Sequence, residues 1–124
     1  MNIGYIRVST DKQDLSNQKH TLLDYANKNK THIDQFVEIE ISSKKDRSER
    51  RIDELLEMLN PSDTIFVTEL SRLGRTMLEV MNIIDELENK KINIVFINQP
   101  ELSSTGSHRK LLQAIYSYIA QTER

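Results

Sequence analysis

The sequence predicts an α/β fold in which an open, mostly parallel β-sheet is flanked by helices. Four short runs rich in Ile, Val and Phe alternate with longer segments whose apolar residues are three or four positions apart. This order is typical of strands joined by crossover helices. The chain has 124 residues, 37% of them hydrophobic, which suits one domain with its own core. No apolar run approaches the ~20 residues that a membrane-spanning helix needs.

The first half of the chain supplies two strands and two helices. Residues 2–8 are expected to form the first strand, and residues 13–29 form an amphipathic helix. A second strand is predicted over residues 33–40. Residues 41–51, ISSKKDRSERR, contain almost no apolar side chain, so we expect a mobile loop there. The second helix is then predicted over residues 50–59.

The second half repeats the alternation. A third strand is predicted over residues 64–70, a helix over residues 77–90 and a fourth strand over residues 92–98. A last helix opens at residue 108 and runs to the final residue without a capping or stop signal. We therefore expect residues 1–124 to be one domain whose last, long helix is cut from something longer.

The end of the first predicted strand carries an unusual pair, Arg7 and Ser9. Because strand side chains alternate between faces, the two share one face, and open α/β sheets bind ligands beyond the carboxyl ends of their strands. The third predicted strand ends at the same edge and is followed by Arg72 and Arg75. We expect few carboxylates nearby, so these guanidinium groups would repel one another unless they bind an anion, and phosphate is the natural one.

Plainer interpretations remain open for these residues. Thr10 and Gln13 have the spacing of a capping box, so the polar end of the strand could serve only to cap the next helix. The two interpretations are compatible, because Thr10 can cap while Ser9 reacts. Arg7 could also pair with an acidic residue of the second predicted strand. The two acidic candidates are Glu38 and Glu40.

Charge and composition limit the other functions. The net charge of −2 argues mildly against nucleic-acid binding, but basic residues are concentrated between positions 44 and 51, in a run that more often forms a solvated loop. The chain has no Cys, its three His residues are scattered, and it has no Gly-rich phosphate-binding motif, so we expect no metal and no cofactor. The first strand begins at the N-terminus, so no signal peptide is visible and a cytoplasmic location is expected.

Three motifs resemble those of the serine recombinases of the resolvase/invertase family. They are YIRVSTDKQDLSNQ at 5–18, ELSRLGR at 69–75 and AQTER at 120–124. Their order and spacing match the family, and so does the β/α order over the whole chain. The resemblance implies a DNA strand-transfer catalyst that needs no metal or cofactor. It also implies double-stranded DNA as partner, a homodimer on each DNA site, a tetramer in synapsis and a further DNA-binding module, with no role for a membrane.

The resemblance also implies roles for individual residues. Ser9 corresponds to the nucleophile that attacks a DNA phosphodiester and forms a 5′-phosphoserine link. The other catalytic positions implied are Arg7, Arg50, Arg72, Arg75, Gln13 and Gln18. The positions assigned to DNA binding are Lys44, Lys45, Arg47, Arg51 and Arg124. Arg47 and Arg51 are the weaker candidates for the role given to Arg50.

The sequence also departs from the family pattern. Ser71 stands where the family usually has the Asp of a D-R-L-G-R motif, so a carboxylate that could orient Arg72 is missing. Ser42 and Ser43 replace an expected Ser-Gly pair, and Leu59 replaces a basic residue. These departures keep open a catalytically weakened, DNA-associated regulatory relative. A receiver domain of similar β/α order is disfavoured, because it needs acidic residues where this chain has arginine and serine.

Overall fold

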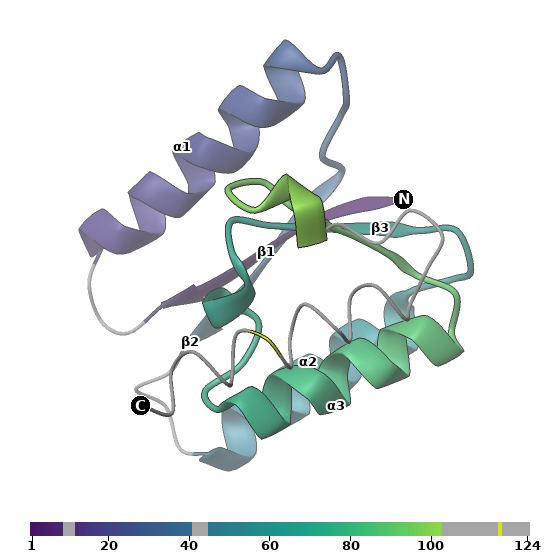
Figure 1. Cartoon of the computed structure of the whole chain (residues 1–124). Coiled ribbons are helices and arrows are strands. Elements are labelled where there is room, and N and C mark those ends of the chain that lie inside the picture. Colours follow the sequence, from purple (N-terminus) through teal and green to yellow (C-terminus); the bar gives the residue numbers. More distant parts are fainter. Residues whose placement is uncertain (9–11, 41–44, 103–116, 118–124) are drawn as a thin grey trace.

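The chain forms a parallel sheet with helices on both faces (Figure 1). The computed structural model describes residues 1–8, 12–40, 45–102 and 117. The strands are β1 (Asn2–Val8), β2 (Gln35–Glu40), β3 (Thr64–Val67) and β4 (Asn93–Phe96). The helices are α1 (Lys12–Lys28), α2 (Lys45–Met58) and α3 (Met77–Asn89), with short 3-10 turns η1 (Leu70–Arg72) and η2 (Pro100–Leu102). The predicted last helix lies outside the described residues.

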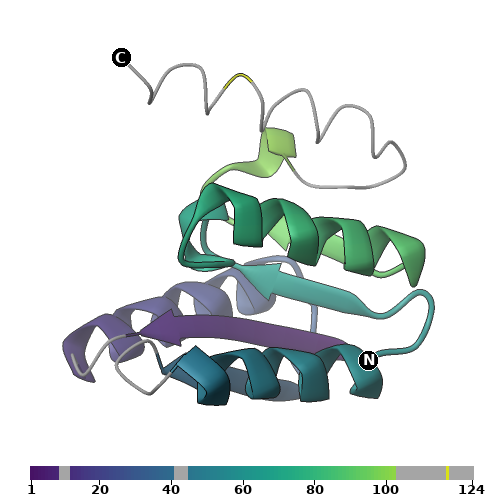
Figure 2. The same cartoon turned by 90° about the horizontal axis from the view of Figure 1, so that it is seen from below.

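The four strands are all parallel and lie in the order β2-β1-β3-β4. The arrowheads of β1 and β3 point the same way in Figure 2. Because β2 and β3 lie on opposite sides of β1, the order reverses between β1 and β3, the place where open α/β sheets bind ligands. This sheet confirms the predicted fold class. β3 pairs with β1 only as far as Gly4 opposite Phe66, so the second half of β1 extends beyond it.

Two apolar clusters hold the layers together. On one face α1 packs against the sheet, with Leu22 and Ala26 buried beside Ile6 and Phe66. On the other face α2 and α3 pack against the sheet in a larger cluster. Figure 1 shows α1 on one side of the strands and the pair α2 and α3 on the other. Since the central strands β1 and β3 are covered on both faces, they are the most continuously buried, whereas the edge strand β2 alternates buried and exposed residues.

Most boundaries lie within two residues of the prediction, and two differ by more. The expected loop over 41–51 is wrong for its second part, because α2 already begins at Lys45. The segment lacks apolar residues but is rich in Lys, Arg and Glu, which have high helix propensity, and Asp46 and Arg50 have the i,i+4 spacing that favours a helix. The third strand ends at Val67 rather than at residue 70, because the chain turns into η1.

Candidate active site

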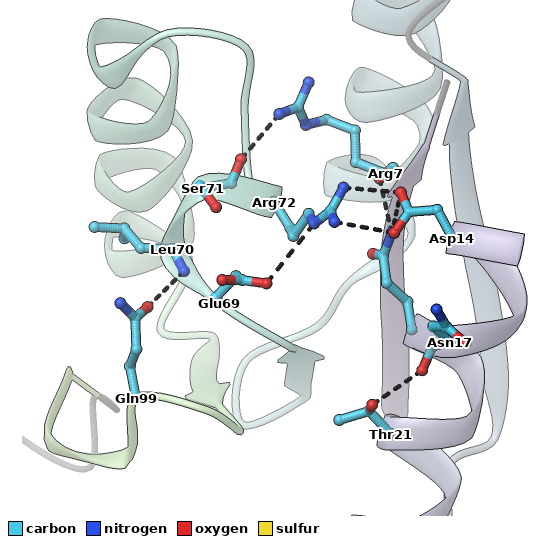
Figure 3. A network of polar contacts seen from close by, with 10 residues as sticks. Arg7, Asp14, Asn17, Thr21, Glu69, Leu70, Ser71, Arg72 and Gln99 are labelled. Carbon is cyan, nitrogen blue, oxygen red and sulfur yellow. Dashed lines mark hydrogen bonds and ion pairs between the residues drawn. The ribbon is translucent and has the colours of Figure 1, made fainter. Parts of the chain in front are cut away.

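The second half of β1, which pairs with β2 but not with β3, is joined to the segment after β3 by two side chains on one face. The hydroxyl of Tyr5 donates a hydrogen bond to the Leu73 carbonyl at 2.8 Å. Nη2 of Arg7 donates to the Ser71 carbonyl at 2.9 Å, as Figure 3 shows. Side chains two residues apart on a strand point to the same face, which explains why both reach the same turn. These bonds replace the ladder that β3 gives up, and they fix η1 beside the carboxyl end of β1.

Arg7 lies in a partly desolvated environment that it shares with two other arginines. Burial is the main cause that lowers its pKa; the charges of Tyr5 and Glu79 act against this, and those of Arg72 and Arg75 lower the pKa further. Its Nε is a buried nitrogen with no hydrogen-bond acceptor among the described residues. The structure thus brings together the three arginines that the sequence placed at one edge. An anion that contacts Arg7 would relieve this unfavourable charge.

Arg72 is held by a carboxylate that the sequence interpretation did not anticipate. Its two terminal nitrogens donate to the two carboxylate oxygens of Asp14, each at 2.9 Å (Figure 3). Nε of Arg72 lies 3.8 Å from a carboxylate oxygen of Glu69. The expectation that the arginines would have few carboxylates nearby is therefore wrong for Arg72. The paired planar geometry is the strongest form of arginine–carboxylate contact.

The two glutamines of the first motif have different surroundings. Gln18 is 4% exposed, and its amide nitrogen donates to the carbonyl of Arg7 at 3.1 Å and to Asp14 at 3.2 Å. It therefore connects β1 to the pair formed by Asp14 and Arg72. Gln13 lies on the exposed side of the first turn of α1 and donates to Asn17 at 3.0 Å.

The alternative pairing of Arg7 with an acidic residue of β2 is wrong. Glu38 lies opposite Ile6 and Glu40 lies opposite Val8 in the parallel register. Because neighbours in register share a face, both carboxylates lie on the face that Arg7 does not use. Glu38 instead lies 3.9 Å from Lys19 of α1.

Several predicted site residues fall outside what the structure describes. They are Ser9, Thr10, Ser42, Ser43, Lys44 and Arg124. The side chains of Lys45, Arg47 and Arg50 also lie outside it, although the backbone of all three is helical. Arg51 is exposed on α2 and lies 3.6 Å from Glu54. Leu59 is buried in the core, where a basic side chain would be costly.

The residues that sequence reasoning missed are Tyr5, Asp14 and Gln99. A tyrosine inside an apolar strand signals a buried hydroxyl that needs a partner. The i,i+4 spacing of Asp14 and Gln18 signals a shared helix face. Gln99 accepts a hydrogen bond from the Leu70 backbone nitrogen at 2.8 Å, and no local pattern indicates it.

Across the part of the chain that the structure describes, no group of three or more His, Asp or Glu side chains could hold a metal ion. Nor is any described helix long and apolar enough to cross a membrane.

A parallel α/β domain with clustered arginines at its switch point defines a class of anion-binding site, and comparison with known proteins identifies the family. Residues 2–124 match the family model described as Resolvase, N terminal domain. The chain belongs to this resolvase family.

Relatives and solved structures agree with that family. A resolvase of Clostridium perfringens (strain 13 / Type A) is 33% identical over 126 residues, which cover all of this chain and 64% of that protein. A DNA-invertase of Escherichia phage P1 is 31% identical over 125 residues, covering 100% of this chain and 62% of the relative. The chain therefore spans less than two thirds of the length of these curated relatives.

The fold is similar to that of the N-terminal catalytic domain of TP901-1 integrase. The TM-score is 0.69 at 21% identity, with 100% of this chain and 97% of the other covered. A resolvase family site-specific recombinase from Streptococcus pneumoniae gives a TM-score of 0.66 at 21% identity, with 99% of this chain and 87% of that chain covered.

Proposed function

We propose that this chain is the catalytic domain of a site-specific DNA recombinase in which Ser9 is the nucleophile. The observation that carries the proposal is the meeting of Arg7 and Arg72 at the carboxyl end of β1, directly before Ser9 in the sequence. Membership of the resolvase family supports the same chemistry. The names of the relatives, resolvase and DNA-invertase, indicate DNA as substrate.

The proposed reaction exchanges one phosphate ester for another. The Ser9 oxygen forms a bond to a DNA phosphorus while the bond from that phosphorus to the 3′ oxygen breaks. The serine proton is given up, a proton is delivered to the 3′ oxygen, and a 5′-phosphoserine and a free 3′-hydroxyl result. A 3′-hydroxyl of another strand then reverses the step. Because each step conserves a phosphate ester, rejoining needs no outside energy source.

The arginines supply the positive charge that this transfer needs. Phosphoryl transfer depends mainly on placement and on neutralising the charge of the non-bridging oxygens. Arg7 is already partly desolvated, so a contact to phosphate there is stronger than it would be in water. A donor of this kind is typically worth ~3–4 kcal/mol in the transition state. Loss of Arg7 or Arg72 is therefore expected nearly to abolish cleavage.

The proposed partners are double-stranded DNA and further copies of the chain. Strand exchange between two duplexes breaks four strands, so it requires four active sites, which a dimer on each site and a tetramer in synapsis provide. The predicted last helix offers an apolar face for this contact, and Ile115→Asp is expected to weaken self-association in sedimentation. The domain alone is expected to bind DNA weakly and with strong salt dependence.

The proposal is tested by trapping the covalent intermediate. The full-length protein is incubated with DNA from the flanks of its own element, and protein–DNA adducts are separated on denaturing gels. Ser9→Ala is expected to remove the adduct, and Ser16→Ala, a matched change on the exposed side of α1, is expected to keep it. An adduct that survives Ser9→Ala would overturn the assignment of the nucleophile.

One observation favours a second candidate, the catalytically weakened regulatory relative. Ser71 presents a carbonyl to Arg7 but has no carboxylate. If the unsubstituted protein binds DNA and forms no adduct, this candidate is preferred. Ser71→Asp is then the first variant in which to look for restored cleavage.

A further inference from the structure

The contact between α1 and η1 assigns a role to a residue that the motifs leave unexplained. Asp14 lies in the first turn of α1 and Arg72 in η1, 58 positions apart in the sequence. Their side chains are 24% and 29% exposed, so the pair is only partly reached by water. It is therefore screened less than a surface ion pair.

The geometry fixes the orientation of the Arg72 guanidinium and leaves an edge of it available. Asp14 takes one N–H from each terminal nitrogen. A guanidinium has five N–H groups, so the edge formed by Nε and one terminal nitrogen stays open to a second acceptor. Glu69 forms an ion pair with Nε at 3.8 Å, beyond hydrogen-bond distance, so its carboxylate has to turn away when a phosphate takes this edge. Asp14 can thus hold the guanidinium plane while a phosphate oxygen binds the side edge.

A second bond ties Asp14 to the strand that carries Arg7. Gln18, which is buried, donates to the same Asp14 oxygen that accepts from Arg72 and also donates to the Arg7 carbonyl. Arg7 in turn donates to the Ser71 carbonyl, next to Arg72. These hydrogen bonds therefore link β1, α1 and η1 in one network, in which Asp14 binds the Arg72 side chain directly and reaches the backbone of Arg7 through Gln18. Figure 3 shows Arg7, Asp14 and Arg72 within it.

We propose that Asp14 is the positioning residue for Arg72, and that it supplies from α1 the orienting carboxylate that position 71 lacks. This proposal rests on the proposed recombinase function. Asp14 does not touch the phosphate, but it orients the group that does. Among the described residues it is the carboxylate that meets both terminal nitrogens of Arg72.

The test compares Asp14→Asn with Asp24→Asn in the full-length protein. Asp24 is on the same helix, but its ion-pair partner is Lys28, at 3.1 Å, and not one of the site arginines. Single-turnover adduct formation is measured at saturating DNA, and DNA affinity is measured separately. Asp14→Asn is expected to slow adduct formation by about 10²-fold, the cost of a small misplacement of a reacting group, with little change in affinity. Asp24→Asn is expected to keep the wild-type rate.

Two further variants distinguish positioning from a purely structural role. Asp14→Glu keeps a carboxylate and is expected to be faster than Asp14→Asn. In an Arg72→Lys background, Asp14→Asn is expected to add little further loss, because the residue acts through Arg72. Additive losses in the double variant would overturn the proposal. So would a rate for Asp14→Asn equal to or above wild type, since the carboxylate would then be a competitor of phosphate.

A readout without DNA separates this proposal from the proposed function. The side-chain N–H resonances of Arg72 are recorded for wild type and Asp14→Asn. In wild type the ion pair with Asp14 is expected to slow the rotation of the Arg72 guanidinium and the proton exchange at its terminal nitrogens. In Asp14→Asn both are expected to be faster. Identical resonances would overturn the role of Asp14 even if adducts form. If wild type forms no adduct but the resonances differ as expected, the proposed function fails and the orienting contact stands.

Discussion

Tyr5→Phe removes one hydroxyl and leaves in place the ring of the one aromatic residue of β1. Tyr5 is 1% exposed, and its hydroxyl donates to the Leu73 carbonyl at 2.8 Å. In the variant this buried carbonyl loses the hydrogen bond from Tyr5. Because Leu73 directly follows η1, the change loosens the anchor of the turn that carries Arg72.

The expected magnitude follows from the burial of the bond. A hydrogen bond contributes about 0.5–1.5 kcal/mol net, and a buried acceptor left without a partner costs about 1–3 kcal/mol. We expect the free energy of unfolding to fall by about 2 kcal/mol. At roughly 4 °C per kcal/mol for a domain of this size, the midpoint of thermal unfolding should fall by about 8 °C.

The pH dependence of the stability difference between wild type and Tyr5→Phe gives an independent check. Burial raises the pKa of the Tyr5 phenol above its ordinary value of 10.0. Above about pH 10 the unfolded chain therefore releases a proton that the folded state retains. The contribution of Tyr5 is full below that pH and falls as the pH rises toward the raised pKa. The stability difference between wild type and Tyr5→Phe should accordingly narrow above about pH 10.

Urea unfolding of wild type and variant at neutral and alkaline pH measures both effects. Tyr25→Phe is the matched control, because its partly exposed ring packs on Phe66 with centroids 5.8 Å apart. The control should change the free energy of unfolding by less than about 0.5 kcal/mol. A Tyr5→Phe variant as stable as wild type, or a difference that does not vary with pH, would refute the reasoning.

Three further outcomes are expected. Gly4→Ala places a Cβ 2.7 Å from the Phe36 ring and should cost about 1–3 kcal/mol by urea unfolding. Asp63 accepts from the Met1 amino group at 2.7 Å, a bond that lowers the carboxyl pKa below 3.8 and raises the amine pKa above 8.0. The bond stabilises the fold fully between about pH 4 and 8, and this contribution is lost as the pH falls through the lowered carboxyl pKa or rises through the raised amine pKa. In Asp63→Asn the urea concentration at the unfolding midpoint should therefore vary less with pH at both the acid and the alkaline end. Arg7→Lys should slow adduct formation about 10²–10³-fold, and an unchanged rate would show that the planar fork is not required.

The sheet and the approach of Arg7 to the segment after β3 were predictable because they depend on short-range patterns. Runs of branched apolar residues gave the four strands, and the alternation of β1 put Tyr5 and Arg7 on one face. The edge shared by parallel strands then predicted that Arg7 and Arg72 would approach. Each of these steps needs only the period of the element and the rule that parallel strands end together.

The partner of Arg72 was not predictable from such patterns. Asp14 and Arg72 meet only because α1 starts close to the end of β1 and η1 turns back over the same edge. Both are properties of how far each element extends, and boundaries are the weakest part of a pattern-based prediction. The start of α2 was missed for a related reason, since a charged helical turn without apolar residues has no hydrophobic period.

The way η1 is attached does not depend on the side chain at position 71. Arg7 donates to the backbone carbonyl of Ser71, and the Ser71 side chain is exposed. Tyr5 likewise donates to a carbonyl rather than to a side chain. The turn is therefore positioned by side chains of β1 acting on its backbone, which is present whatever residue stands there. A serine at 71 therefore leaves the turn in place, and under our proposal α1 supplies through Asp14 the carboxylate that orients Arg72.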